Sequence, residues 1–287
     1  MKKNKVVVTG IGIVSPVGID RETTWDSIIR GRSGINTINS FDTQGLETNI
    51  AAQVNDFDPT DYISLKESRR MDRFVQLSVA ASLEAVNQSN LNINSSNAED
   101  IAVVISSGIG GIITLSEQIE VMLQKGARRV SPFLVPMMLP DMASGQVSML
   151  LGAKGPNFAT VSACASGGDA IGQSAKMIAD GTSKIAITGG TEAAICPIGI
   201  AGFNSCKALS KNNQEPEKAS RPFDAKRDGF VLGEGAAILI LESLESAESR
   251  GAKPLAEIIG YGATGDAHHI TQPAPEGEGG ARAMKIA

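Results

Sequence analysis

The sequence predicts an α/β fold in which helices cover a sheet, and two observations support this prediction. Short β-branched runs alternate along the 287 residues with longer segments that carry apolar residues at helical spacing. Glycine is abundant, with 31 residues, whereas aromatic residues make up only 4% of the chain, so small and aliphatic side chains must build the core. Strands that alternate with helices are typical of a mainly parallel, layered sheet.

The amino-terminal part of the chain predicts a strand followed by a helix. Residues 5–9 form a short β-branched run, which predicts a buried strand that Gly10 and Gly12 bring to an end. Asp20 is a suitable N-cap for the next helix, because its carboxylate can accept backbone N–H bonds. We expect this helix to end near Gly31.

The next helix is predicted from a capping box and an apolar stripe. Ser64 and Glu67 have the spacing at which each side chain bonds the backbone N–H of the other residue. Apolar and small residues at helical spacing follow from Phe74 to Ala85. Together these features predict one helix that buries a single face.

Strands and helices alternate through the remaining two thirds of the chain. Strands are expected at residues 101–107, 157–163, 184–190, 236–243 and 254–262. Helices are expected at residues 113–124, 139–151, 165–179 and 244–250.

Charge and cysteine content limit the classes of function. The net charge is −5, so bulk electrostatics give no reason to expect nucleic-acid binding. Three cysteines are too few for a disulfide framework, which favours a reducing cytoplasm. The basic start of the chain lacks the apolar core of a signal peptide, and no stretch approaches the ~20 apolar residues of a membrane span. No spacing of His and Cys residues predicts a metal site, and we expect no bound cofactor.

Cys164 is the strongest candidate for a catalytic residue. It stands where the expected strand turns into a helix that opens at Ser166 with two glycines behind it. The partial positive charge at a helix N-terminus favours a thiolate, and backbone N–H groups of such a turn can stabilise an oxyanion. On these grounds alone Cys164 could equally be a buried structural cysteine. Cys196 and Cys206 have no comparable setting, and we interpret both as structural.

The segment around Cys164, TVSACASGGDAIG, resembles the active-site turn of the β-ketoacyl-acyl-carrier-protein synthases of the thiolase superfamily. Further runs resemble the elongating type II members in the same order along the chain. These runs are VVVTGIGIVSPVG, VSPFLVPMMLPDMASGQVS, ITGGTEAAICPIGIAGFNSCKALS, SRPFDAKRDGFVLGEGAAIL and GYGATGDAHHITQPAPEGEGG. The resemblance implies that Cys164 accepts a fatty acyl chain, which then condenses with malonyl-acyl-carrier-protein in a decarboxylative Claisen condensation.

The same resemblance implies a thiolase-like fold with α-β-α-β-α layers and two similar halves. Residues 1–250 are expected to form the first half, which carries the nucleophile, and residues 251–287 the start of the second. The final run ARAMKIA begins a helical pattern without a C-cap, so we expect the second half to be truncated. Members of the family are homodimers, so a homodimer is expected of the full-length form, with residues 157–163 near the two-fold axis.

The family decarboxylates malonyl-carrier-protein with two histidines on NAHGTST-like and SMTGH-like motifs, and this sequence contains neither motif. Its two histidines, His268 and His269, are adjacent in a DAHHIT run that resembles a DAYHIT-like loop of the family. The catalytic role is therefore not carried over to them, and the chain as given is expected not to complete condensation. From this loop, the resemblance implies that His269 and Thr271 lie near the phosphopantetheine arm, which belongs to the carrier protein.

The resemblance also implies residues of the acyl pocket. Ile109 matches a position that limits access of the acyl chain, and Phe203 matches a wall residue near the cysteine. Ordinary core packing is the alternative for both side chains. The glycines around Ile109 favour a loop where backbone closely approaches another group.

Clustered positive charges in an acidic chain suggest an acidic partner, which the resemblance names as acyl carrier protein. Lys66, Arg69, Arg70 and Arg73 fall on one face of the predicted helix, although we interpret Arg73 as solvated. The expected docking residues are Lys66, Arg69, Arg70, Arg128, Arg129 and Lys207.

Other functions remain as alternatives. A dinucleotide-binding oxidoreductase is disfavoured because Gly10 and Gly12 lack a third glycine at the position of Ser15. A CoA-using initiating synthase or a thiolase fits the GFVLGEGA block and the basic helix less well. A polyketide-type ketosynthase and a non-catalytic fragment stay open.

Overall fold

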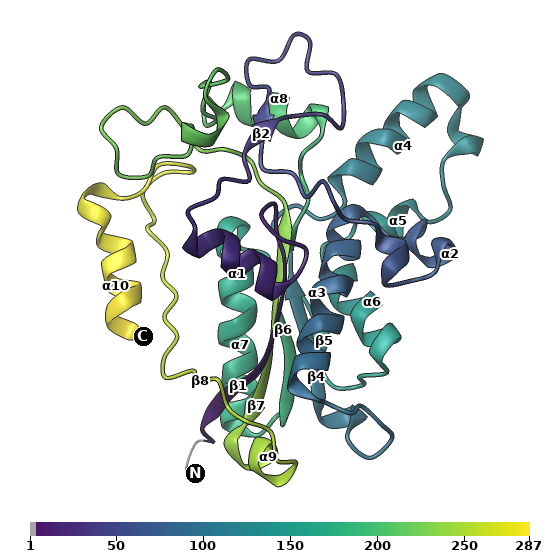
Figure 1. Ribbon diagram of the computed structural model, residues 1–287, viewed down its shortest axis with the longest axis vertical. Coiled ribbons are helices and arrows are strands. Elements are labelled where there is room, and N and C mark those ends of the chain that lie inside the picture. Colours follow the sequence, from purple (N-terminus) through teal and green to yellow (C-terminus); the bar gives the residue numbers. More distant parts are fainter. Residues whose placement is uncertain (1–3) are drawn as a thin grey trace.

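A six-stranded sheet lies at the centre of the computed structural model, which describes residues 4–287 (Figure 1). The basic start of the chain, residues 1–3, lies outside the described residues. In spatial order the strands are β5 (Asn157–Phe158), β4 (Ile101–Ser106), β6 (Ile185–Glu192), β7 (Gly235–Ser243), β1 (Val6–Val14) and β8 (Ala256–Glu257). A separate pair of short strands consists of β2 (Asn36–Thr37) and β3 (Ile50–Ala51).

The sheet is mixed, so the prediction of a mainly parallel sheet is wrong. Strand β4 pairs in parallel with β5 and β6, whereas β7 is antiparallel to both β6 and β1, and β8 is antiparallel to β1. The reason lies in the connection between β6 and β7. Glu192 at the end of β6 pairs with Gly235 at the start of β7. The intervening residues therefore bring the chain back to the same end of the neighbouring strand, and the chain direction reverses.

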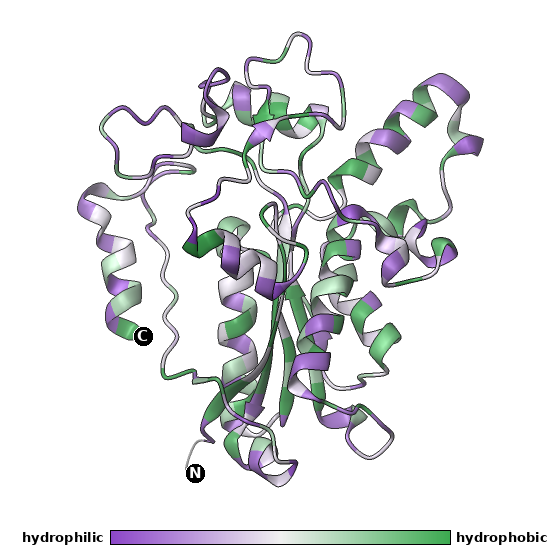
Figure 2. Ribbon diagram, in the orientation of Figure 1, coloured by the Kyte–Doolittle hydropathy of each residue, from purple (hydrophilic) through white to green (hydrophobic). Residues whose placement is uncertain are grey.

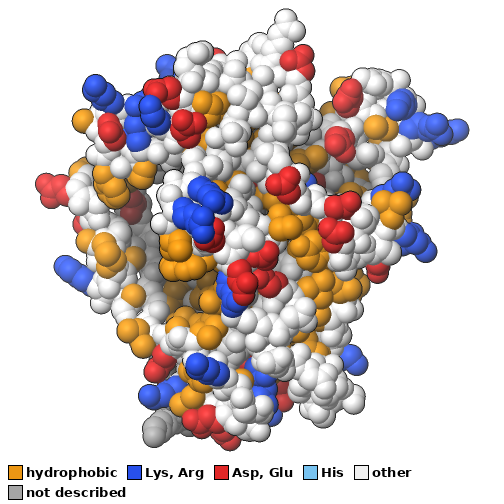
Figure 3. Space-filling view, viewed as in Figure 1, with side chains coloured by type: hydrophobic (Ala, Val, Ile, Leu, Met, Phe, Trp, Pro, Cys, Tyr) orange, Lys and Arg blue, Asp and Glu red, His pale blue; other side chains and the backbone are white. Residues whose placement is uncertain are grey.

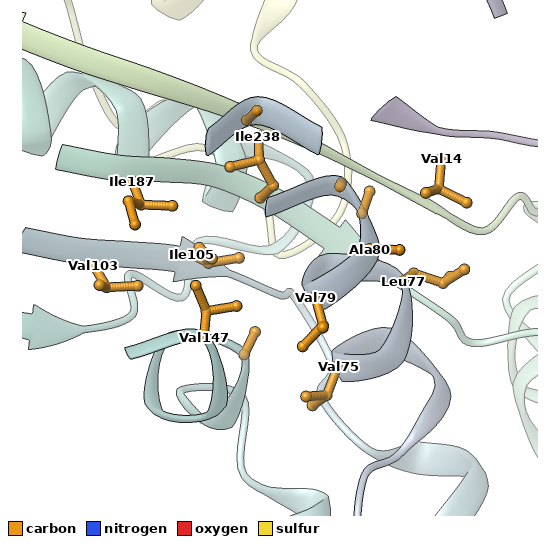
Figure 4. Packing of buried hydrophobic residues seen from close by; sticks show 14 of the residues in the cluster. Val14, Val75, Leu77, Val79, Ala80, Val103, Ile105, Val147, Ile187 and Ile238 are labelled. Carbon is orange, nitrogen blue, oxygen red and sulfur yellow. The ribbon is translucent and has the colours of Figure 1, made fainter. Parts of the chain in front are cut away.

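Helices cover both faces of the sheet (Figure 1). Helices α3 (Arg73–Ser89) and α6 (Met142–Leu151) pack on one face, and α7 (Ser166–Asp180) packs on the other. Alternate residues of β4 serve the two faces: Val103 points to the α3 side and Val104 to the α7 side. Figure 4 shows the cluster on the α3 side, where Val147, Ile105 and Ile187 point toward one another.

The remaining helices lie around this central layer. Their bounds are α1 (Arg21–Ile29), α2 (Leu65–Ser68), α4 (Ile112–Lys125), α5 (Leu134–Met138), α8 (Pro197–Ser205), α9 (Leu244–Ser249) and α10 (Glu278–Ile286). In Figure 2 the central strands are largely hydrophobic while the outer helices carry both colours, as expected for a sheet buried between two helical layers. No helix within residues 4–287 is both long and apolar enough to cross a membrane.

Strand β1 runs through its glycines instead of ending at them, which corrects the predicted end. A Cβ atom at Gly10 would lie 2.3 Å from the Ala85 carbonyl oxygen, and one at Gly12 would lie 1.9 Å from that of Ala81. These glycines therefore let the strand pack directly against the backbone of α3. The register shift between Val8 and Gly10 accompanies this close approach.

The predicted helix caps are present, although one helix is two. Asp20 caps α1 by accepting the Thr23 N–H at 2.7 Å. The capping box of Ser64 and Glu67 is also formed, but α2 ends at Ser68.

A second N-cap, Asp72, begins α3 after this break. One carboxylate oxygen of Asp72 accepts the Phe74 N–H at 3.4 Å, and the other accepts the Thr114 N–H at 2.8 Å. Asp72 thus caps the start of α3 and at the same time holds the first turn of α4 beside it. As a result Lys66 and Arg73 belong to different helices, so the prediction of one continuous basic helical face is wrong.

Two predicted strands are much shorter in the structure. Only Asn157–Phe158 of residues 157–163 and only Ala256–Glu257 of residues 254–262 join the sheet. Both lie at the edges of the sheet, where pairing on one side alone limits their length. The other predicted strands and helices are confirmed apart from differences in their bounds of up to three residues.

The last segment of the chain stands apart from the central layers (Figure 1). It leaves β8 and returns as α10, whose end packs against two glycines of the irregular segment that follows β8. A Cβ atom at Gly260 would lie 2.0 Å from the Ala287 carbonyl oxygen, and one at Gly262 would lie 2.1 Å from that of Ala283. The assignment of residues 251–287 to the start of a second half stays a prediction.

Candidate active site

A cavity of about 660 Å³ opens at the carboxyl end of β6, and Cys164 lies on its wall. Apolar and small residues dominate the lining. The larger side chains that line it are Ile13, Val14, Ile109, Phe203, Phe230 and Leu232. Glu192 is the one carboxylate among the lining residues in the described part of the chain. Such a cavity suits a long apolar group attached at the cysteine.

Cys164 is exposed and lies in a single 3-10 turn, Ala163–Ala165, directly before α7. The turn is held by Ser166, whose Oγ donates to the Ala163 carbonyl at 2.7 Å and accepts the Ser162 N–H at 3.0 Å. Ala163 has φ 51°, in the left-handed region that a residue with a Cβ adopts at a cost of about 1 kcal/mol. The turn that carries Cys164 is therefore a strained conformation that partly buried hydrogen bonds maintain.

The sequence predicted that a continuous strand leads into this turn. In the structure a loop leads into it, and a hydrogen bond to β4 helps to fix that loop. The Thr160 N–H donates to Ser106 Oγ at 2.9 Å, and Thr160 Oγ1 donates to the Ser166 carbonyl at 3.1 Å. Residues between β5 and α7 thus cross the end of β4 as a loop.

A third contact joins the turn to the segment after β8. Ser162 Oγ and the Tyr261 hydroxyl both donate to Asp169, at 2.5 and 2.6 Å. These hydrogen bonds, first that from Ser162, lower the pKa of the Asp169 carboxyl below its usual range. The bond to Asp169 in turn raises the pKa of the Tyr261 hydroxyl.

Glu192 is a site residue that the sequence reasoning missed. Its Oε1 accepts from Ser107 Oγ at 2.9 Å, and its Oε2 accepts the N–H groups of Gly108 and Ile109 at 2.9 and 3.2 Å. Burial raises the pKa of this carboxyl, although the hydrogen bonds oppose the rise. The available signal was a lone acidic residue at the end of an apolar strand, KIAITGGTE.

The structure brings the two expected pocket residues to one cavity with Cys164. Ile109 lies in the loop between β4 and α4, and Phe203 lies in α8. Phe203 packs edge-on against Phe230, with ring centroids 5.3 Å apart. The sequence analysis did not single out Phe230, although it lies in the GFVLGEGA block.

The histidine loop lies elsewhere. His268, His269 and Thr271 are exposed, and none of them is among the residues that line the cavity. His269 Nδ1 accepts the N–H groups of Thr271 and Gln272, both at 3.1 Å, which folds the loop back on itself. Of the other cysteines, Cys196 is buried, as expected for a structural residue, whereas Cys206 is exposed.

The six expected docking cations are all exposed. The guanidinium of Arg70 lies 4.6 Å from the centroid of the Phe133 ring, so the α2 segment contacts the chain that follows Arg129. We call α2 with the residues that follow it, together with α4 and the turn at Ala127–Arg129, the α2–α4 lobe. Figure 3 shows positive side chains on this lobe, over the outer end of α4 and beside α2. Five of the six residues belong to this lobe, and Lys207 follows α8 instead.

Arg73 is partly buried and paired with Glu234 instead of being a solvated side chain, which corrects our interpretation of it. Its Nε and Nη2 donate to the two carboxylate oxygens of Glu234, at 2.8 and 2.7 Å. The Glu234 side chain is only 2% exposed. Arg73 therefore contributes to the interior and does not belong to the docking surface.

Comparison with known proteins assigns the family. The chain matches the family model described as Beta-ketoacyl synthase, N-terminal domain, over residues 3–247. It is 54% identical over 288 aligned positions to 3-oxoacyl-[acyl-carrier-protein] synthase 2 of Staphylococcus aureus (strain COL), an alignment that covers 100% of this chain and 69% of the relative. The chain belongs to the β-ketoacyl synthase family.

Solved structures of β-ketoacyl synthases and ketosynthases have the same fold. The crystal structure of a β-ketoacyl synthase from Burkholderia phymatum STM815 matches with a TM-score of 0.89 at 35% identity, over 99% of this chain and 69% of that chain. A type II polyketide ketosynthase, bound to the hexaketide and in complex with its acyl-carrier protein, matches with a TM-score of 0.85 at 30% identity, over 99% and 69%. The predicted thiolase-like fold is confirmed.

As a β-ketoacyl synthase, the chain is an acyltransferase of the condensing type. The predicted resemblance to elongating type II synthases is confirmed by the identity to synthase 2. The dinucleotide-binding alternative is wrong, because Gly10 and Gly12 serve close packing of β1 on α3. The roles of individual site residues stay proposals.

Proposed function

We propose that this chain carries out the acyl-accepting step of a 3-oxoacyl-[acyl-carrier-protein] synthase in fatty-acid elongation. The observation that carries the proposal is Cys164, an exposed thiol at the N-terminus of α7 on the wall of an apolar cavity. The identity of 54% to synthase 2 of Staphylococcus aureus supports the same reaction class. A polyketide ketosynthase is the less favoured alternative, since the relative of that kind is 30% identical.

In the proposed step, the Cys164 thiolate attacks the thioester carbonyl of an acyl-loaded carrier protein. A bond from Sγ to the acyl carbon forms, and the phosphopantetheine thiolate leaves and takes up a proton. The helix N-terminus of α7 favours the negative charge of the attacking sulfur. The acyl chain then lies in the cavity along Ile109, Phe203 and Phe230. In the complete reaction, this acyl group condenses with the carbanion that remains when malonyl-carrier-protein loses CO₂.

Acyl carrier protein is the proposed partner in both its acyl- and malonyl-loaded forms. The exposed cations of the α2–α4 lobe and Lys207 offer positive charge to an acidic partner. The neighbouring polyketide ketosynthase was solved in complex with its own acyl-carrier protein, which supports this kind of partner. From the resemblance we also propose that His269 and Thr271 contact the phosphopantetheine arm.

We further propose a homodimer, formed through the edge of the sheet at β5. An edge strand offers unpaired backbone groups to a second copy, and the side chains of Phe158 and Val161 are exposed there. The proposed compartment is the cytoplasm, where the three free cysteines would stay reduced.

Acylation of the 287-residue chain by dodecanoyl-carrier-protein, followed by intact mass spectrometry and peptide mapping, tests the nucleophile. A single acyl adduct on Cys164 is expected, with none in the Cys164→Ser variant. Cys206→Ser is the matched control, because Cys206 is also exposed but has no place in the cavity lining. An adduct that maps to Cys206, or no adduct at all, would contradict the proposal.

Charge reversal tests the docking surface. The double variant Arg128→Glu and Arg129→Glu should slow acylation by the carrier protein at low salt by about tenfold, because steering by opposite charge is lost. Acylation by a small acyl thioester should not change, since that donor does not use the lobe. If the natural chain and the double variant were acylated by the carrier protein at equal rates, the proposed docking surface would be wrong.

A further inference from the structure

The loop from Ser107 to Gly111 brings Ile109 to the cavity, and both of its ends are fixed. At the far end, a Cβ atom at Gly110 would lie 2.7 Å from the Met138 carbonyl oxygen, and one at Gly111 would lie 2.1 Å from that of Met137. Gly110 also has φ +76°. The loop backbone is thus pressed against the chain at residues 137 and 138, with no room for side chains at these two glycines.

At the near end, the side chain of Glu192 holds the loop by hydrogen bonds. Three donors from the loop converge on its carboxylate: Ser107 Oγ, the Gly108 N–H and the Ile109 N–H. Ser107 Oγ in turn accepts the Gly110 N–H at 2.8 Å. All the loop polar groups in this network therefore depend, directly or through Ser107, on one side chain from β6.

The same loop touches the nucleophile turn. A Cβ atom at Gly108 would lie 3.1 Å from Glu192 Oε2 and 3.1 Å from the Ala163 carbonyl oxygen. The backbone at Gly108 is therefore wedged between the carboxylate and the residue that precedes Cys164. Because Ile109 follows Gly108 directly, this packing of the Gly108 backbone also fixes the position of Ile109 relative to the Cys164 thiol.

Glu192 is unsuited to hold the acyl chain itself, because both of its oxygens already accept hydrogen bonds from the loop. A carboxylate is well suited to the role of a clamp, since its two oxygens can accept all three donors at once. Loss of this acceptor would leave the partly buried Gly108 N–H without a partner and would free the Ile109 N–H, so the loop would shift to bring both groups to water.

We infer that Glu192 is a positioning residue that clamps the Ile109 loop and thereby sets the length of acyl chain that can occupy the cavity at Cys164. The inference rests on the proposed function of Cys164 as the acyl acceptor. Glu192 acts through Ile109 and does not contact the reacting atoms. Release of the loop should let Ile109 move aside and admit longer chains.

The test uses alkyl methanethiosulfonates from methyl to dodecyl, which form mixed disulfides with a thiol whether or not the protein transfers acyl groups. All variants carry Cys206→Ser, so that Cys164 is the exposed thiol that reacts. The measured quantity is the ratio of the dodecyl rate to the methyl rate, followed by mass spectrometry. Glu192→Ala and Glu192→Asp should raise this ratio about fivefold, the effect of roughly 1 kcal/mol on the loop equilibrium.

Matched variants distinguish positioning from general damage. Glu192→Gln should keep most of the original ratio, because its amide oxygen can still accept both N–H groups and its amide can donate to Ser107 Oγ. Ile109→Ala should raise the ratio as Glu192→Ala does, and the double variant should add little further, since both changes act on one gate. Where Glu192→Ala fails to fold, Glu192→Asp carries the comparison.

Unchanged ratios in Glu192→Asp and Glu192→Ala would overturn the inference, as would full additivity with Ile109→Ala. Failure of the proposed function is a separate result. In that case dodecanoyl-carrier-protein would leave Cys164 unmodified, while the ratio measured with the alkyl reagents would still report on the loop.

Discussion

Arg73 in α3 closes over Glu234, the residue that precedes β7, with two charge-assisted hydrogen bonds of 2.8 and 2.7 Å. Both residues also bind Val54: Arg73 Nη2 donates to its carbonyl at 2.6 Å, and Glu234 Oε1 accepts its N–H at 2.8 Å. Gly235 and Ala236, which follow at once, line the cavity. One ion pair therefore connects α3, the chain at Val54 and the cavity wall.

Replacement of Arg73 by Ala should destabilise the protein strongly. The Glu234 carboxylate is almost fully buried, so removal of its partner leaves an uncompensated charge at a cost of about 3 kcal/mol or more. Urea unfolding measures the change. Arg69→Ala is the control, with an expected change below about 0.5 kcal/mol because Arg69 is exposed. Similar losses in both variants would show that the pair adds no special stability.

A methyl group at Gly172 should detach the segment after β8. A Cβ atom there would lie 2.2 Å from the Tyr261 ring, so Ala would displace the ring and break its bond to Asp169. We expect a loss of about 1–3 kcal/mol and faster tryptic cleavage at Arg282 and Lys285, which lie in the same segment. Gly168→Ala, in the same helix with nothing within 4 Å of its Cβ, should be neutral or stabilising by up to about 1 kcal/mol. A stable Gly172→Ala protein would argue against this packing.

The stability of the protein should depend on pH through Asp72. Burial raises the pKa of this carboxyl above its usual 3.8, so the folded state binds the proton more tightly than the unfolded state. The contribution is therefore fully present below pH 3.8 and is lost as pH rises through the raised pKa.

Asp72→Asn lacks this titration but also loses one acceptor for the Phe74 or Thr114 N–H, a constant cost of about 1–3 kcal/mol. In urea unfolding at a series of pH values, the stability advantage of the natural protein over Asp72→Asn should shrink as pH rises above 3.8. A difference that stays constant, or grows, would contradict the assignment.

Acylation without decarboxylation is expected of this chain. The chain has two histidines, and both lie in an exposed loop outside the cavity lining. No imidazole is therefore placed to stabilise the enolate that forms when malonyl-carrier-protein loses CO₂ beside Cys164. Release of labelled CO₂ should not exceed that of the Cys164→Ala variant, and robust turnover by the natural chain would refute this prediction.

Local sequence patterns predicted the local structure well. Asp20, Ser64 and Glu67 were recognised as caps because a capping bond joins residues two or three apart, so its spacing is visible in the sequence. Apolar runs likewise predicted β4, β6 and β7, since β4 and β6 are buried almost throughout and most of β7 is buried. The break between α2 and α3 was missed because Asp72 also accepts a hydrogen bond from the Thr114 N–H. That contact joins residues 42 positions apart, so the local pattern does not show it.

The candidate site was predicted in part. Cys164 was found from its place before a glycine-rich helix, and the family resemblance supplied Ile109 and Phe203. Glu192 escaped notice because its partners in the loop are 83 to 85 positions away in the sequence. Arg73 was misread for the same reason, since Glu234 is 161 positions away.

The sequence by itself predicted the family, and it predicted Cys164 as the candidate nucleophile at the start of a helix, because these predictions depend on residue types at short, fixed spacings. Only the tertiary structure decided that the sheet is mixed, that the turn at Cys164 is a strained loop, and that Glu192 holds Ile109 over the cavity. These features arise where distant segments pack together. Polar groups that become buried there need hydrogen-bond partners, and these partners come from distant parts of the sequence. A local sequence pattern therefore does not predict them.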